Sequence, residues 1–221
     1  MALYLLTSMF PKGLDDGVAR IFRQAVGGRR SLAFVASDFD QDHARTDRYF
    51  HLFLQMLKDG GVTFAQTQVV DGRMTPEAAQ EAVRTAEVLW LSGGDTPAEW
   101  ADWQRYGLPP VLRAHDGLLI GMSAGAMNLA KTVVCTPQSG HRQFCTYPGL
   151  GCVPFTLVPH FEPPGDLAHP ALAQGGYGLG DDGIILYQPA SGGQGSRTGF
   201  YGPVWQLTPQ GPRPVPATMG L

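Results

Sequence analysis

One serine of the chain lies in a stretch of small residues that could make it a nucleophile. Residues 121–126 read Gly-Met-Ser-Ala-Gly-Ala, so Ser123 has a glycine two positions before it and another two positions after it. An apolar run, 118–120, precedes this stretch, and a helix-like run, 126–130, follows it. A strand, a sharp Gly-x-Ser-x-Gly turn and a helix form a nucleophile elbow, whose small residues let the two backbones nearly touch. The N-terminus of the following helix would lie beneath Ser123 and stabilise negative charge there. We therefore predict that Ser123 is a nucleophile.

A serine hydroxyl is a poor nucleophile unless a base takes its proton and an acid orients that base. Among the histidines, His160 follows the strand-like run 153–158 and sits in the sequence Pro-His-Phe. A histidine at the end of a buried strand lies at the same sheet edge as Ser123, so we predict that His160 is the base. A loop histidine bonded to the backbone is the alternative. Three other histidines suit a helix surface or a loop: His43, His51 and His115.

Two carboxylates could orient His160. Asp181 and Asp182 lie in the stretch Gly-Leu-Gly-Asp-Asp-Gly, just before the apolar run 184–186. Either carboxylate would lie at a junction between a loop and a strand, near the base. An ordinary turn is the alternative, because Asp-Gly is a frequent turn dipeptide.

The negative charge on an attacked carbonyl oxygen needs two N–H donors aimed at one point. One donor should be the N–H of Ala124, directly after the nucleophile. The second could come from Gly93 or Gly94, which follow the apolar run 88–91. Glycine at these positions would let the backbone approach a substrate closely. Both glycines also suit a turn into the next helix, and the two roles are compatible.

Strand-like and helix-like patterns alternate along the chain. Apolar runs predict strands at 2–6, 32–36, 62–70, 88–91, 118–122, 153–158, 183–187 and 204–207. Helical spacing or helix-start signals mark 15–25, 42–58, 75–77 and 96–105. This order predicts one α/β domain, residues 1–221, with a mostly parallel sheet whose carboxyl edge carries Ser123. A capping box is expected for the helix at 96–105, with Thr96 as the cap, Pro97 first in the helix and Glu99 reaching back.

Composition limits the classes of function. The 221 residues carry a net charge of −3 and no basic stripe, which argues against nucleic acid as a partner. No apolar run approaches the roughly 18 residues that a membrane span needs. The cysteines are odd in number and lack the spacing of a metal site, so we expect reduced thiols in a cytoplasmic protein and no bound metal. They are Cys135, Cys145 and Cys152.

Four of these motifs, in this order, resemble a known family. They are Gly-Gly-Asp-Thr at 93–96, the elbow at 121–126, Pro-His-Phe at 159–161 and Gly-Leu-Gly-Asp at 178–181. The chain resembles the serine peptidases of the peptidase E (aspartyl dipeptidase) and cyanophycinase superfamily. The interval of 37 residues between Ser123 and His160 is also similar to that of peptidase E.

The resemblance implies a flavodoxin-like α/β sandwich, with helices on both faces, related to class I glutamine amidotransferases. It implies a catalytic triad in which Ser123 is the nucleophile and His160 the general base. The acid of peptidase E is a glutamate, and the aligned residue here is Asp181, with Asp182 still possible because aspartate is shorter. The implied oxyanion donors are the N–H groups of Gly94 and Ala124.

The sequence departs from peptidase E where that enzyme binds its substrate. Peptidase E uses an arginine after the catalytic histidine to hold an N-terminal aspartyl side chain. Residues 161–180 here contain neither arginine nor lysine, and they contain Glu162, Asp166 and His169. Carboxylates would repel an acidic substrate side chain, so we expect neither strict specificity for N-terminal aspartate nor cleavage of cyanophycin. Arg142 could bind a substrate carboxylate, with a solvated loop position as the alternative. The other candidates for substrate contact are Gly93, Asp95 and Thr96.

We therefore expect a serine peptidase that cleaves short peptides through an acyl-enzyme on Ser123, without a metal or an organic cofactor. One alternative is an α/β-hydrolase esterase, which shares the elbow but has its acid before its histidine in the chain. Another is a non-catalytic domain that binds a small ligand or a partner on the same scaffold. A glutamine amidotransferase would carry cysteine at the elbow. We expect a monomer or a homodimer, with neither nucleic acid nor a membrane as partner.

Overall fold

The computed structural model describes residues 2–137, 144–165, 172 and 175–219. Its centre is a seven-stranded sheet with the strand order β11-β10-β1-β5-β4-β2-β3. Five neighbouring strands are parallel: β1 (Leu3–Thr7), β5 (Leu118–Met122), β4 (Val88–Leu91), β2 (Ser31–Val35) and β3 (Gln66–Val70). The antiparallel strands β10 (Ile184–Gln188) and β11 (Arg197–Tyr201) extend the sheet beyond β1. The predicted mixed α/β fold with a mostly parallel central sheet is confirmed.

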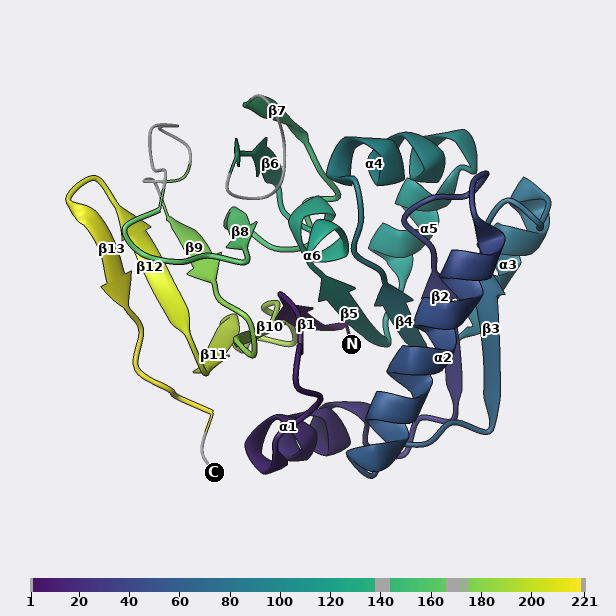
Figure 1. Cartoon of the computed structure of the whole chain (residues 1–221), viewed down its shortest axis with the longest axis horizontal. Helices are drawn as coiled ribbons and strands as arrows, with labels where there is room; N and C mark the ends of the chain where they lie inside the picture. The colour runs from purple at the N-terminus through teal and green to yellow at the C-terminus, as the bar shows by residue number, and fades with distance from the viewer. Residues whose placement is uncertain (1, 138–143, 166–171, 173–174, 220–221) are drawn as a thin grey trace.

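Helices cover both faces of this sheet (Figure 1). On one face lie α1 (Asp16–Val26) and α2 (His43–Asp59); on the other lie α3 (Pro76–Thr85), α4 (Thr96–Arg105), α5 (Leu108–Ala114) and α6 (Ala124–Asn128). Along β4, Val88 and Trp90 join the core beneath α1 and α2. The alternate residues Leu89 and Leu91 join the core beneath α3 and α5. A strand buried on both faces has no polar side, which is why β4 reads as one unbroken apolar run.

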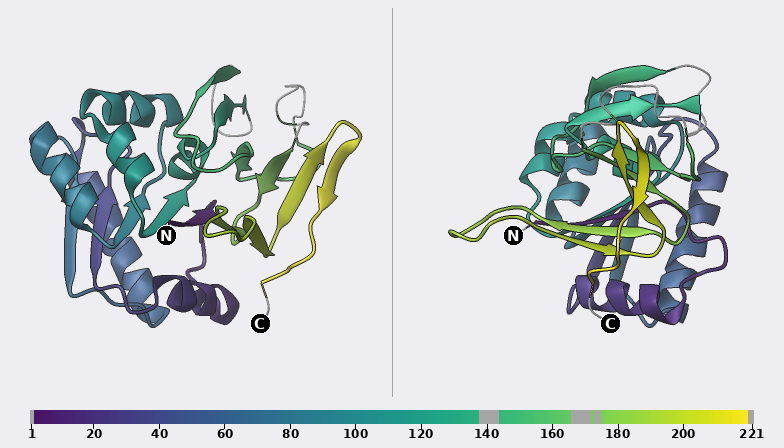
Figure 2. Two further views of the ribbon diagram at one scale, coloured as in Figure 1. Left: turned by 180° about the vertical axis from the view of Figure 1, so that it is seen from behind. Right: turned by 90° about the vertical axis from the view of Figure 1, so that its left-hand side faces the viewer.

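Two smaller sheets complete the fold. The strands β8 (Leu157–Pro159), β9 (Gly176–Leu179), β12 (Val204–Thr208) and β13 (Gly211–Pro214) form one, and β6 (Thr132–Cys135) pairs with β7 (Cys145–Pro148) in the other. The four-stranded sheet lies beside the β10–β11 edge of the large sheet, and the β10–β11 hairpin projects from the body (Figure 2). Because β10 follows β9 and pairs with β1, the loop after β9 lies beside the end of β1.

Most predicted elements are confirmed within a few residues, two predicted strands begin later than expected, and the helix α5 was not predicted. The strand predicted at 62–70 begins only at Gln66, and the strand predicted at 153–158 is the short β8. Pro109 and Pro110 lie in the first turn of α5, where a missing N–H costs the helix no hydrogen bond.

The capping box predicted for α4 is wrong. The cap is Asp95, whose Oδ1 accepts a hydrogen bond from the N–H of Ala98 (2.9 Å), and Thr96 is the first residue of the helix. Glu99 points inward instead, where its Oε2 accepts a hydrogen bond from the Nδ2–H of Asn128 (2.8 Å). Asp and Thr both suit an N-cap, and the chain has them in succession, so the local pattern gave a start one residue too late.

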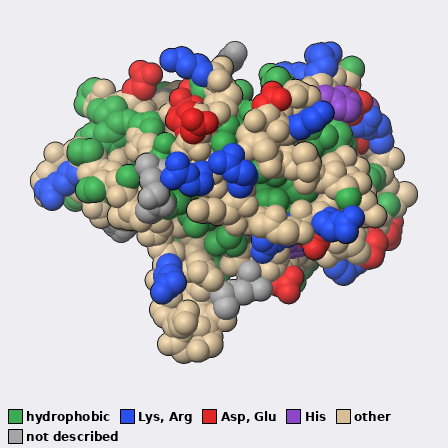
Figure 3. Space-filling view, turned by 90° about the horizontal axis from the view of Figure 1, so that it is seen from below, with side chains coloured by type: hydrophobic (Ala, Val, Ile, Leu, Met, Phe, Trp, Pro, Cys, Tyr) green, Lys and Arg blue, Asp and Glu red, His purple; other side chains and the backbone are tan. Residues whose placement is uncertain are grey.

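Charged side chains of both signs are interspersed on the face seen from below (Figure 3). This matches the small net charge of −3. No helix in the described ranges is both long and apolar enough to cross a bilayer.

Glu99 makes the stability of the protein depend on pH. Its side chain is fully buried, and this burial raises the pKa of its carboxyl well above the usual range, against the opposing hydrogen bond from Asn128. Because the folded state binds the proton of the Glu99 carboxyl more tightly than the unfolded state, the stabilising contribution of Glu99 is present at low pH. This contribution is lost as pH rises through the raised pKa. We expect Glu99→Gln, which stays neutral, to gain stability over the wild type as pH rises from about 5 to about 9, measured by urea unfolding.

The exposed Glu77 on α3 supplies the control, since Glu77→Gln should change stability by the same small amount across this range. A Glu99→Gln variant that loses the same free energy of unfolding at every pH would contradict the account.

Candidate active site

Ser123 occupies the turn between β5 and α6. Its backbone has φ 51° and ψ −108°, a conformation that residues other than glycine rarely adopt. The N–H of Ser123 donates a hydrogen bond to the carbonyl of Thr7 at the end of β1 (2.9 Å). The strained residue is thus held at the carboxyl edge of the parallel strands, where ligands bind in sheets of this kind.

Two glycines allow α6 to lie close to the sheet. A Cβ atom on Gly121 would lie 2.8 Å from the Cα of Ala126, and one on Gly125 would lie 2.4 Å from the carbonyl oxygen of Leu91. Both contacts are with backbone atoms, which cannot move aside as the end of a flexible side chain can. The Gly-x-Ser-x-Gly spacing therefore has a packing cause in this fold.

The imidazole of His160 lies between Ser123 and Asp181. Its Nε2 is 3.0 Å from the Oγ of Ser123, and its Nδ1 is 2.9 Å from the Oδ1 of Asp181. His160 follows β8 directly, and Asp181 follows β9 after one glycine. Because β8 and β9 are parallel neighbours, their carboxyl ends bring the two side chains together. Each of these side chains is 41% exposed, so the group opens to solvent.

Asp182 has other contacts than Asp181, although the two are neighbours in the chain. It has a positive φ of 65°, and its N–H donates a hydrogen bond to the carbonyl of Met9 (2.8 Å). Burial raises the pKa of its carboxyl, and the carboxylates of Asp181 and Asp15 raise it further. Of the two aspartates that the sequence left open, Asp181 is the one whose carboxylate contacts the imidazole.

Ser8 is a member of this cluster that the sequence analysis missed. Its hydroxyl oxygen accepts a hydrogen bond from the N–H of His160 (2.8 Å) and donates one to the Oδ1 of Asp181 (2.9 Å). A serine after the first strand carries no motif, and its partners are more than 150 residues away in the sequence. Only the pairing of β1 with β5 and β10 would have pointed to it.

The candidates after β4 occupy different environments. Gly93 lies against the nucleophile, since a Cβ atom added to it would be 3.1 Å from the Cβ of Ser123. A Cβ atom on Gly94 would lie 2.6 Å from the Cβ of Ser37, so a side chain there would require Ser37 to shift. Asp95 is exposed, and its carboxylate caps α4. Thr96 is buried, and its hydroxyl contacts the Sδ of Met127 at 3.6 Å, so its side chain lies in the interior.

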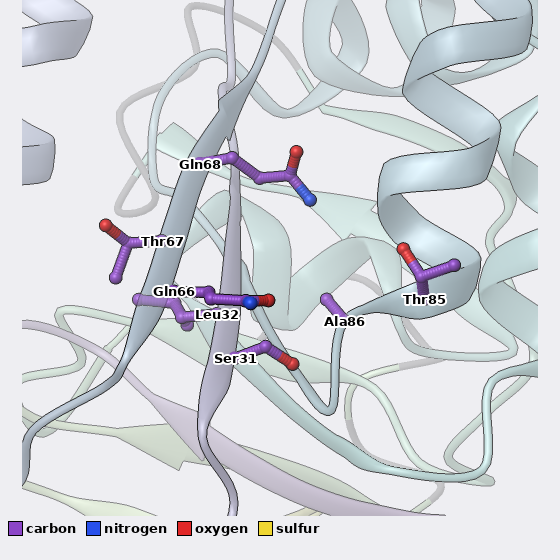
Figure 4. Close-up of a pocket in the computed structure, with 7 residues that line it drawn as sticks. All are labelled: Ser31, Leu32, Gln66, Thr67, Gln68, Thr85 and Ala86. Atoms are coloured by element: carbon purple, nitrogen blue, oxygen red, sulfur yellow. The ribbon is translucent and has the colours of Figure 1, made fainter.

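Three residues considered for substrate binding lie outside the described residues: Arg142, Asp166 and His169. Glu162 is described and is exposed, two residues after His160. A separate pocket of about 200 Å³ lies at the opposite edge of the sheet, where β2 and β3 begin and α3 ends (Figure 4). This pocket takes no part in the cluster around Ser123. Most of the residues that line it are polar: Ser31, Leu32, Gln66, Thr67, Gln68, Thr85 and Ala86.

Known structures resemble the whole chain. A peptidase from an acI-B1 actinobacterium has a TM-score of 0.68 and 18% sequence identity, over 99% of this chain and 95% of that one. A putative peptidase E protein from Listeria monocytogenes EGD-e has a TM-score of 0.62 and 16% identity, over 91% of this chain and 100% of that one. At such identities the likeness shows a shared fold.

Sequence comparison identifies the family. No curated protein matches the chain. The sequence model of Peptidase family S51 matches residues 12–175, a range that includes Ser123 and His160 and ends before Asp181. Because this match spans most of the chain, the protein belongs to peptidase family S51.

Proposed function

We propose that the chain is a serine peptidase that hydrolyses short peptides, with Ser123 as nucleophile, His160 as general base and Asp181 as the acid that orients the base. The observation that carries this proposal is the position of the imidazole, 3.0 Å from the hydroxyl of Ser123 and 2.9 Å from the carboxylate of Asp181. Membership of a peptidase family supports the class of reaction.

The two contacts decide which proton each nitrogen handles. A carboxylate accepts hydrogen bonds, so Asp181 favours the tautomer of His160 with its proton on Nδ1. The lone pair of Nε2 then faces Ser123 and takes the hydroxyl proton as Oγ attacks the carbonyl carbon of the peptide. The imidazolium gives this proton to the leaving amine, and an ester on Ser123 remains. Water, activated by the same nitrogen, hydrolyses the ester and restores the hydroxyl.

The negative charge on the attacked oxygen is stabilised by backbone N–H groups in this proposal. Ala124 follows the nucleophile directly and supplies one donor, and Gly94 supplies the second. The closeness of Gly93 to Ser123 supports this assignment, because a Cβ atom on Gly93 would lie 3.1 Å from the Cβ of the nucleophile. The steps need neither a metal nor an organic cofactor.

The charges around the site bear on the substrate. Asp95 and Glu162 are exposed carboxylates near Gly94 and His160 in the sequence, and residues 161–180 contain neither arginine nor lysine. Such surroundings disfavour an acidic side chain of the substrate, because like charges repel. We propose that the peptidase is not restricted to peptides with N-terminal aspartate.

The two adjacent aspartates provide a matched test of the triad. Asp181→Asn should lower kcat by about three to four orders of magnitude, because an amide can donate to Nδ1 and hold the wrong tautomer. Asp182→Asn should leave kcat close to that of the wild type. Steady-state kinetics on a dipeptide substrate measures both, and circular dichroism checks that both variants fold. Equal losses in the two variants would contradict the assignment of Asp181.

A substrate panel tests the reaction and its specificity. Dipeptides that begin with alanine, leucine or lysine should be cleaved with a kcat/KM at least equal to that of dipeptides that begin with aspartate. Cleavage of aspartyl dipeptides alone would refute the proposed breadth. If p-nitrophenyl esters are hydrolysed and every peptide is left intact, the protein is an esterase and the peptidase proposal is wrong.

A further inference from the structure

Ser8 lies immediately after β1 and is completely buried. Its hydroxyl contacts two members of the site, His160 and Asp181, from the side opposite to solvent. A hydroxyl has one proton to donate and two lone pairs to accept with. Its role therefore follows from where that single proton goes.

The backbone N–H of His160 determines in which direction the hydroxyl of Ser8 donates its proton. Its N–H donates to the Oγ of Ser8 at 2.8 Å, so Ser8 acts as an acceptor there. The hydroxyl proton is then free for the Oδ1 of Asp181, at 2.9 Å. The same Oδ1 also lies 2.9 Å from the Nδ1 of His160. One oxygen of Asp181 thus accepts two hydrogen bonds. These bonds fix the hydroxyl of Ser8 and the imidazole of His160 relative to each other.

Ser8 also lies 3.2 Å from the Nδ1 of His160. Donation of the hydroxyl proton to Nδ1 would leave the ring proton on Nε2, where it faces Ser123 and prevents Nε2 from acting as a base. Asp181 draws the hydroxyl proton to itself because a hydrogen bond to a charged acceptor is the stronger one. Ser8 and Asp181 therefore favour the productive tautomer as a pair.

The backbone around Ser8 serves the same cluster. His160 has a positive φ of 53°, a costly conformation for a residue other than glycine, and its N–H is satisfied by Ser8. The carbonyl of Thr7 accepts the N–H of Ser123, and the carbonyl of Met9 accepts the N–H of Asp182. Three consecutive residues at the end of β1, Thr7 to Met9, thus hold the three loops that carry the site.

We propose that Ser8 is a positioning residue of this site, whose hydroxyl aligns the imidazole of His160 and the carboxylate of Asp181 by binding both. The proposal rests on the proposed serine peptidase function. It concerns the rate of the chemical step, because Ser8 is buried beneath the cluster and acts on the substrate only through His160.

The first test is Ser8→Ala. The variant should lose about 10-fold to 100-fold in kcat with little change in KM, as expected for a hydrogen bond to a charged group that acts on the base. Ser31→Ala is the matched control. The Oγ of Ser31 also accepts a backbone N–H, from Glu87 (2.9 Å), and lies 3.4 Å from the carboxylate of Glu87, at the opposite edge of the sheet. It should lose stability without losing kcat.

A double-mutant cycle separates positioning from a general structural effect. In an Asp181→Asn background, most of the loss caused by Ser8→Ala should disappear, because the carboxylate through which Ser8 acts is already gone. If the double variant loses kcat by the full product of the two single losses, the proposal is overturned. So would a Ser8→Ala enzyme with the kcat of the wild type.

A spectroscopic readout keeps this test separate from that of the proposed function. A proton held between Nδ1 and a carboxylate gives a far-downfield signal in proton NMR, and this signal needs no substrate. It should be present in the wild type and in Ser31→Ala, and be lost or strongly shifted in Ser8→Ala. An unchanged signal in Ser8→Ala would refute the role of Ser8. A wild type that shows the signal but hydrolyses no substrate would refute the proposed function and leave the alignment by Ser8 supported.

Discussion

The imidazole of His160, held between the hydroxyl of Ser123 and the carboxylate of Asp181, is the contact on which the account of this protein depends. Three strands meet to make it. Ser123 follows β5, His160 follows β8 and Asp181 follows β9 after one glycine, and these strands belong to two different sheets. Thr7 and Ser8, at the end of β1, accept hydrogen bonds from the backbone N–H groups of Ser123 and His160, so the geometry of the site depends on the packing of both sheets.

The parts of the site that could be predicted are those with a local cause. The glycines around Ser123 are dictated by the close approach of α6 to β4 and β5, and this approach leaves a pattern within six residues. His160 could be proposed because it follows an apolar run, and the carboxyl ends of parallel strands share an edge. Asp181 could be proposed because it lies at a junction between a loop and a strand, just before the apolar run 184–186. The local residues left the choice between Asp181 and Asp182 open, because the positive φ of Asp182 and its hydrogen bond to the carbonyl of Met9 leave no pattern in the sequence.

The parts that could not be predicted depend on distant partners or on competing local signals. Ser8 has no motif, and its role arises only from contacts across more than 150 residues. Glu99 fitted a capping box by its spacing, yet the core around Asn128 takes its side chain inward. Tertiary packing decides each of these cases.

The most direct measurement is covalent labelling with a fluorophosphonate, followed by peptide mapping of the modified residue. This reagent is attacked by activated serine hydroxyls, and the chain has many other serines for comparison. The account predicts a single adduct on Ser123 in the folded wild type and a labelling rate that falls steeply in His160→Ala. Labelling at another serine, or labelling of Ser123 that proceeds equally fast without the imidazole, would contradict it.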